Sequence, residues 1–147
     1  MFGVYDASMD CGIQNYPAIQ PYPDYYAYTL LGGANYLNIT DSAYVANAPS
    51  VKPAGVYVNG FYTRSLDSIA LVNTTASDYQ TLHIFLQNPG KVTATQANVY
   101  TLAFNPHSPS SSISTTRVNL VAVTGGGFMA TVHLPAYTMI GISATAQ

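Results

Sequence analysis

The stretch Tyr79-Gln80-Thr81-Leu82-His83-Ile84-Phe85-Leu86 decides the fold class, because apolar residues recur at every second position of its second half, at Leu82, Ile84 and Leu86. Alternation with a period of two is typical of a strand with one buried face, and it directs Leu82, Ile84 and Leu86 towards a core. His83 then points outward. The sequence Asn88-Pro89-Gly90-Lys91 that follows is typical of a turn. Strand and turn signals of this kind recur along most of the chain.

Similar alternation on both sides of this stretch predicts an all-β fold, a two-sheet antiparallel β-sandwich of about eight strands. Asn59-Gly60 indicates either a hairpin or a bulge inside a strand, Gly125-Gly126-Gly127 a hairpin turn, and Pro135 a kink between two strands. Residues 105–112 are expected to form a flexible loop. The predicted strands cover residues 34–39, 56–63, 67–73, 79–86, 97–104, 117–123, 128–134 and 137–143.

Further core positions follow from the same alternation. The apolar residues expected to join Leu82, Ile84 and Leu86 in the core are Val99, Tyr100, Leu102, Val118, Leu120, Val121, Val123, Met139 or Ile140, and Ile142.

One short helix is predicted ahead of the strands. Pro23 and Asp24 suit a helix start, Gly32-Gly33 supplies a stop, and Tyr26, Leu30 and Leu31 fall on one face. The chain therefore divides into an aromatic, proline-containing N-terminal segment with this helix, residues 1–33, and a sandwich domain, residues 34–147.

The composition excludes several classes of protein. Charged residues make up only 7% of the 147 residues and the net charge is −2, so nothing favours nucleic-acid binding. Cys11 is the only cysteine, which excludes an intrachain disulfide. No apolar run approaches the length of a membrane-spanning helix, and the residues after Met1 do not resemble a signal peptide. The polar, weakly charged surface predicts an extracellular or secreted protein whose signal would lie upstream.

Three stretches point to a known group of proteins. They are Ser68-Ile69-Ala70-Leu71-Val72-Asn73-Thr74, Ala97-Asn98-Val99-Tyr100-Thr101-Leu102 and Val132-His133-Leu134-Pro135-Ala136-Tyr137-Thr138-Met139-Ile140. They resemble the C-terminal β-sandwich of retaining glycosidases built on a TIM barrel, the heparanase-like and arabinofuranosidase-like group. The resemblance implies an accessory domain or a fragment of a larger enzyme, with a neighbouring catalytic domain as partner. Residues 1–33 would then include the last barrel helix.

The chain departs from that group in its acidic residues. Glycosidases of this kind use two glutamates, an acid/base and a nucleophile, about 5 Å apart. All six acidic residues here are aspartates, so no catalytic residue can be carried over. We therefore expect a non-catalytic domain without a cofactor.

Histidine and cysteine provide little alternative chemistry. His83, His107 and His133 show no tight metal-ligand spacing, so we expect surface or partly packed imidazoles rather than a metal site. A nucleophile at Cys11, flanked by Asp6 and Asp10, would need a histidine to approach it, and the spacing does not favour this.

Tyrosine is unusually frequent, with 13 copies and no tryptophan. The candidate carbohydrate-binding residues are Tyr22, Tyr25, Tyr26 and Tyr28, because aromatic rings stack on the C–H faces of sugars while the hydroxyl binds sugar hydroxyls. The alternative is that they pack the helix against the sheet or against a missing neighbour domain.

Asn38-Ile39-Thr40 and Asn73-Thr74-Thr75 match the N-glycosylation motif, so Asn38 and Asn73 are candidate acceptors in an exported protein. Three functions stay open from the sequence. They are the accessory sandwich of a glycosidase, a stand-alone carbohydrate-binding module, and a self-assembling extracellular subunit that forms homo-oligomers by strand exchange.

Overall fold

The computed structural model describes residues 14–15, 20–21, 23–39, 44–46, 52–62, 66–87, 93–103 and 112–145. These residues form one helix, α1 (Pro23–Gly32), and ten strands. The strands are β1 (Gln14–Asn15), β2 (Gln20–Pro21), β3 (Tyr44–Ala46), β4 (Val56–Tyr62), β5 (Leu66–Asn73), β6 (Tyr79–Leu86), β7 (Gln96–Ala103), β8 (Ser112–Ala122), β9 (Phe128–Leu134) and β10 (Thr138–Thr145).

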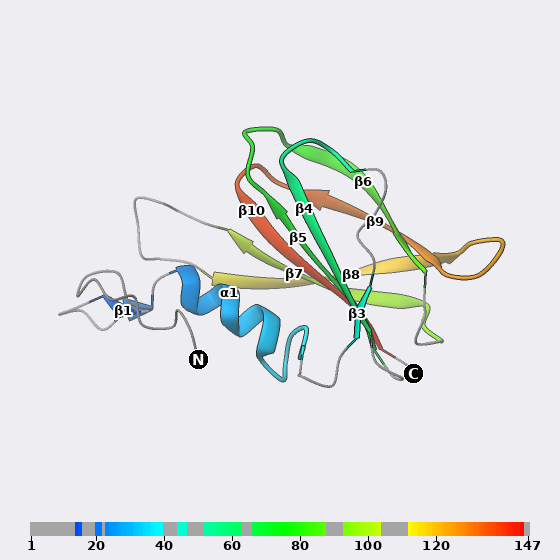
Figure 1. Cartoon of the computed structure of the whole chain (residues 1–147), viewed down its shortest axis with the longest axis horizontal. Helices are drawn as coiled ribbons and strands as arrows, with labels where there is room; N and C mark the ends of the chain where they lie inside the picture. The colour runs from blue at the N-terminus through cyan, green and yellow to red at the C-terminus, as the bar shows by residue number, and fades with distance from the viewer. Residues whose placement is uncertain are drawn as a thin grey trace.

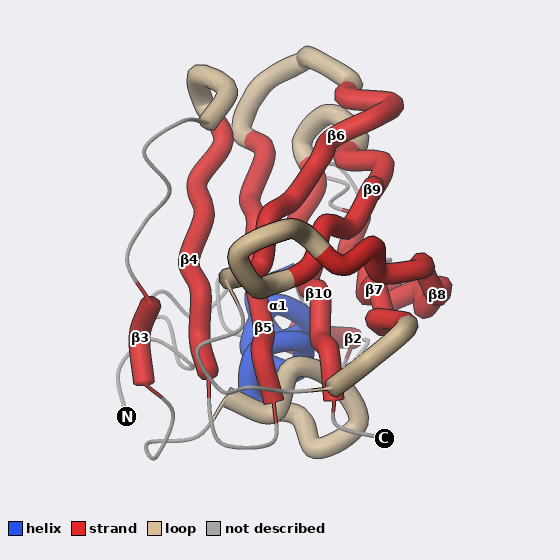
Figure 2. The backbone as a smooth tube through the Cα atoms, turned by 90° about the vertical axis from the view of Figure 1, so that its right-hand side faces the viewer, coloured by secondary structure: helices blue, strands red, loops and turns tan. Residues whose placement is uncertain are grey.

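Eight of the strands form one curled antiparallel sheet in the order β3-β4-β5-β10-β7-β8-β9-β6. Strand β8 belongs to two layers, because residues 112–119 pair with β7 while residues 120–122 pair with β9. We call β3, β4, β5, β10, β7 and the first part of β8 the main sheet, and the end of β8 with β9 and β6 the small layer. Figure 2 shows β6 and β9 lying over the main-sheet strands. The predicted two-layer all-β fold with one short helix is confirmed, and β8 joins its layers.

The larger core lies between the two layers. Alternate residues of each strand point into it, so the main sheet contributes Val56, Leu71, Ile140 and Ile142 and the small layer contributes Leu134, all without exposed surface. The predicted core residues Leu82, Ile84, Val118 and Leu120 pack against this cluster, and Leu86 and Val99 are buried in it.

A second core lies on the opposite face of the main sheet, beneath α1. Leu30 and Leu37 are fully buried there against Tyr100, Leu102 and Met139. Gly141 makes the close approach possible, since a Cβ at this position would lie 2.8–2.9 Å from the methyl carbons of Leu30 and Leu37. Figure 1 shows α1 and the small layer on opposite sides of the main sheet.

The predicted strand at residues 34–39 is wrong. These residues form a turn that folds back on the helix, with Tyr36 N donating to Gly33 O (2.9 Å) and Leu37 N donating to Leu30 O (3.1 Å). The turn buries Leu37 completely, which gives the apolar residues of this segment a helix-side partner instead of a strand.

Three other predictions about the strands need correction. Asn59-Gly60 forms neither hairpin nor bulge, because both residues continue the regular β4–β5 pairing opposite Ala70 and Ile69. Strand β8 begins at Ser112, within the predicted loop and five residues before the predicted strand. Val121 is 56% exposed rather than in the core. The turn at residues 88–91 and the rest of the loop at residues 105–112 lie outside the described residues.

One end of the sandwich is held together by the Asn73 amide. Its Nδ2 donates to Ser77 O and to Pro135 O, both at 2.8 Å, and its Oδ1 accepts from the Thr75 backbone N (3.0 Å) and hydroxyl (2.8 Å). Asn73 is 2% exposed. This side chain therefore fastens the β5–β6 turn to the β9–β10 turn, where the main sheet passes into the small layer.

Candidate functional site

Helix α1 has an unusual sequence for an element at the surface of a small domain. Its ten residues, PDYYAYTLLG, include a single charged side chain, at its second position, and aromatic or aliphatic residues on every side. A helix that is apolar all round is normally buried all round. Among the described residues it contacts the main-sheet strands β7, β10 and β8, and also the short strand β2.

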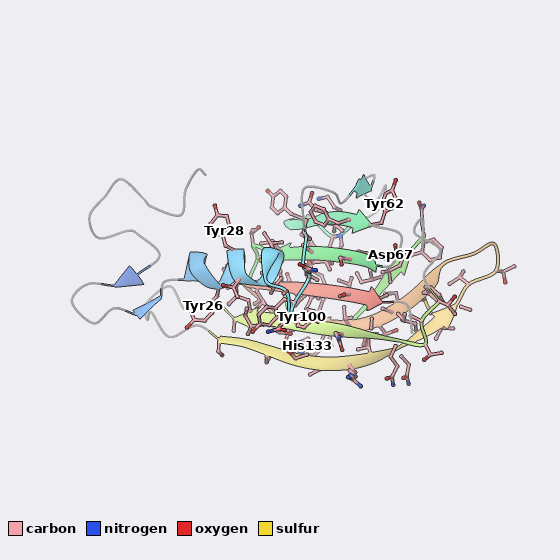
Figure 3. All side chains as sticks on the ribbon, turned by 90° about the horizontal axis from the view of Figure 1, so that it is seen from below. Tyr26, Tyr28, Tyr62, Asp67, Tyr100 and His133 are labelled. Carbon is pink, nitrogen blue, oxygen red and sulfur yellow. The ribbon has the colours of Figure 1, made fainter. Side chains whose placement is uncertain are left out.

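The two predicted tyrosines whose side chains are described lie on different sides of α1. Tyr26 is half-buried and packs with the cluster beneath α1, whereas Tyr28 is 48% exposed. Figure 3 shows the two side chains leaving α1 in opposite directions. Tyr22 and the side chain of Tyr25 lie outside the described part of the chain, so carbohydrate binding by the four tyrosines stays a prediction.

Another tyrosine pair serves packing between the helix-side turn and the sheet. The rings of Tyr36 and Tyr100 meet edge to face, with centroids 5.3 Å apart and planes at 82°. Tyr100 is only 5% exposed. These two aromatics therefore pack the turn after α1 against the main sheet.

The described residues do not cover the outward side of the small layer in this way. Phe85 of β6 lies directly opposite Met129 of β9, and Met129 lies opposite Val121 of β8. Directly opposite residues point to the same side of a sheet, so the three side chains form one row across three strands. Phe85 is 50% and Val121 is 56% exposed, which leaves an apolar row at the surface.

Polar side chains continue this surface along β6 and β9. His83 lies opposite Thr131, and their side chains form a hydrogen bond of 3.1 Å between Nδ1 and Oγ1. His133, two residues further along β9, places its Nε2 2.5 Å from Asp78 Oδ1. We define the open face by its six outward side chains, His83, Phe85, Val121, Met129, Thr131 and His133.

Asp78 anchors one end of the open face. Its Oδ2 accepts a hydrogen bond from Gln80 Nε2 at 2.8 Å, while its Oδ1 faces His133. His133 and Asp78 are each nearly half exposed, so both remain accessible from solvent. The carboxylate, amide and imidazole groups therefore orient one another at this end of the open face.

The structure tests the prediction of outward-pointing imidazoles for two of the three histidines. His83 and His133 point outward as expected, while His107 lies outside the described residues. Cys11, Asp6 and Asp10 lie outside them too. Among the described side chains no group of His, Cys, Asp and Glu could hold a metal ion.

Two further exposed aromatics were not singled out from the sequence. Tyr57 of β4 is 58% exposed, and Lys52 Nζ lies 5.5 Å from the centre of its ring. Tyr137, in the β9–β10 turn, is 56% exposed. Phe85 was also missed, because its position between two core residues suggested only a strand; the period of two, which turns it outward, was the available signal.

The two candidate glycosylation sites have different environments. Asn38 is exposed at the end of the turn after α1, with a φ of 49°. Asn73 is buried, and both hydrogens of the amide that would receive a glycan are donated to backbone carbonyls. In the folded chain Asn38, and not Asn73, is therefore the candidate acceptor.

Comparisons with known proteins match the fold and not the sequence. No protein-family model matches, and no curated protein sequence is significantly similar. A glycoside hydrolase family 30 subfamily 8 xylanase from Clostridium acetobutylicum superimposes with a TM-score of 0.67 and 18% identity, covering 92% of this chain and 31% of the xylanase. A family 30 endoxylanase from Clostridium papyrosolvens gives 0.60 and 19%, covering 90% and 30%. This chain therefore has the fold of a part of these xylanases and spans about a third of their length.

Proposed function

We propose that this chain is the non-catalytic β-sandwich of a glycoside hydrolase and packs against a neighbouring catalytic domain through the outward side of α1. The observation that supports this most directly is the helix itself. Its apolar circumference is covered by the main sheet on one side, and Tyr28 is left 48% exposed on another. A second domain on the outward side would bury the rest of the helix.

The fold comparison supports the same role. The similarity extends over nine-tenths of this chain but about three-tenths of two family 30 xylanases. The remaining length of those enzymes leaves room for a separate catalytic part. Xylan is accordingly the first substrate to test for the whole protein.

The acidic residues support a non-catalytic role. Glycoside hydrolysis uses two carboxyl groups roughly 5–9.5 Å apart. Two of the six aspartates, Asp67 and Asp78, have described side chains, and only these two can be compared. Asp67 is buried in β5, and Asp78 follows the opposite end of that strand, so the two are separated by about 20 Å at the usual rise per residue. The sequence contains no glutamate to replace either one.

Secretion belongs to the same proposal. The described part of the chain has no helix long and apolar enough to cross a membrane. The few charged residues and the exposed Asn38 acceptor site suit a protein that acts on polysaccharide outside the cell. If the host glycosylates such sites, Asn38 is the residue we expect to carry the glycan.

An immunoblot combined with a xylan zymogram of the source organism's culture medium tests the proposal. Antibodies against this chain should detect a secreted polypeptide roughly three times its length, given the 31% coverage of the xylanase, and that band should clear xylan. The purified 147-residue chain should clear none. Hydrolysis by the chain alone would overturn the non-catalytic assignment, and ordered assemblies of the chain in light scattering would favour the self-assembling subunit.

A further inference from the structure

We propose that the open face of the small layer is a binding site for a neutral polysaccharide chain. The site lies outside the tyrosine-rich segment from which carbohydrate binding was predicted. The proposal deepens the proposed function and rests on it in one respect, that packing through α1 leaves the opposite side of the sandwich accessible. Figures 1 and 2 show the small layer on the far side of the main sheet from α1.

The apolar row supplies a stacking surface. Phe85, Met129 and Val121 lie side by side on three neighbouring strands. Adjacent strands are about 4.8 Å apart, so the row extends for about 10 Å. An aromatic ring at one end of the row, followed by a thioether and then an aliphatic group, matches the C–H face of a sugar ring laid across the strands.

The polar half of the open face supplies partners for sugar hydroxyls. His83 is held by Thr131, and His133 is held by Asp78, which also accepts from Gln80. Imidazole, hydroxyl, amide and carboxylate groups together can donate to and accept from hydroxyls. Because these side chains are already fixed by one another, less conformational entropy is lost when a ligand binds.

The charges favour a neutral sugar over an acidic one. Strands β6 (YQTLHIFL) and β9 (FMATVHL) contain no lysine or arginine, and the one arginine of β8, Arg117, lies four residues from Val121, about 13 Å along the strand. The carboxylate at this surface, Asp78, would repel a uronic acid. Nucleic acid and acidic glycans therefore fit poorly, whereas neutral hydroxyl-rich chains meet no charge of the wrong sign.

A carbohydrate also fits the surface better than a protein partner does. The apolar part is one row of three side chains, with His83 and Thr131 as the next outward pair and with His133 and Asp78 further along β9. A stable protein interface buries about 800 Å² on each partner around a continuous apolar centre. A single apolar row bordered by groups that bind hydroxyls suits an elongated ligand that has both apolar and polar faces.

Calorimetric titration of the 147-residue chain with xylohexaose tests the site. We expect measurable binding, weakened about tenfold or more by Phe85→Ala, which removes the stacking ring. His133→Ala should weaken it by a smaller factor. The matched control is Tyr57→Ala, which removes a similarly exposed aromatic ring from β4 of the main sheet. A charged probe, hexagalacturonate, should bind more weakly than xylohexaose.

Circular dichroism and the thermal midpoint of each variant show whether it is folded. Absence of binding by the unmodified chain, unchanged affinity in folded Phe85→Ala, or a larger loss in Tyr57→Ala would each overturn the proposal. Tighter binding of hexagalacturonate would overturn the neutral-ligand assignment. The titration uses the chain alone, so its result is independent of whether a larger xylanase is found in the medium.

Discussion

The sandwich has two outward surfaces, and they differ in how far their apolar side chains are covered. On the main sheet, α1 and the turn after it bury Leu30, Leu37 and Leu102 completely. On the small layer, Phe85 and Val121 remain half or more exposed, beside hydrogen-bonded histidines. An apolar helix packs on the first surface, whereas the described residues leave the apolar row of the second exposed. That contrast is why we assign attachment to one surface and ligand binding to the other.

The covered surface should be sensitive to loss of volume. Leu37→Ala removes a fully buried side chain that packs over Gly141, and it should lower the free energy of unfolding by about 2–5 kcal/mol. Urea denaturation followed by circular dichroism measures the change. Tyr28→Ala, on the exposed part of the same helix, should stay within about 0.5 kcal/mol of the unmodified chain. Equal effects of the two substitutions would show that α1 is not packed as described.

The stability of the junction between the main sheet and the small layer should depend on the side-chain amide of Asn73. Asn73→Ala leaves the Ser77 and Pro135 carbonyls and the Thr75 N–H without their buried partner, at a cost of about 1–3 kcal/mol. Hydrogen exchange should accelerate first in β6 and β9, because the two turns that lead into the small layer are released. Asn59→Ala, at an exposed position of β4, is the control and should leave these rates unchanged. Faster exchange confined to α1 would contradict this role of Asn73.

The hairpin that closes the small layer offers a more local test. Gly126 and Gly127 both have left-handed backbones, with φ of 98° and 94°. A Cβ on Gly126 would meet nothing within 4 Å, whereas one on Gly127 would lie 2.4 Å from the Leu86 carbonyl oxygen. Both Gly→Ala changes should destabilise the fold through backbone strain, and Gly127→Ala should do so by at least about 1 kcal/mol more. Equal melting temperatures for the two variants would be incompatible with the described β6–β9 pairing.

The smallest expected effect concerns the open face itself. Val121→Thr keeps the branched side chain on an exposed strand position and should change stability by less than about 0.5 kcal/mol. The same substitution at Val99, which is 4% exposed, buries a hydroxyl in the core and should cost about 1–3 kcal/mol. Similar melting temperatures for the two variants would place Val121 in the core after all.

The sequence predicted the elements whose local signals were unambiguous. Strands β6 and β9 and helix α1 have the expected bounds, because a period of two or a proline start and a glycine stop defines each of them. Strand β8 was only half predicted. Its first five residues, Ser-Ile-Ser-Thr-Thr, are mostly small and polar, and they are strand because β7 pairs with them. That pairing depends on tertiary structure and leaves little trace in local sequence.

The same limit explains what was missed at the surface. Leu120 and Val121 are both apolar, and sequence alone cannot decide which of them faces inward where β8 passes from one layer to the other. Phe85 was taken only as part of a strand, because its neighbours Ile84 and Leu86 suggested a core and nothing local indicated a ligand. The row with Met129 and Val121 requires three strand registers, which become visible only in the folded sheet.

Hydroxyl-radical footprinting of the isolated chain and of the larger secreted enzyme to which we propose it belongs tests most directly whether α1 is the attachment surface. We expect modification of Tyr28 to fall several-fold in the intact protein, while Phe85 and His133 are modified equally in both. Equal modification of Tyr28 in the two forms, or protection of Phe85 instead, would contradict the assignment of the two surfaces.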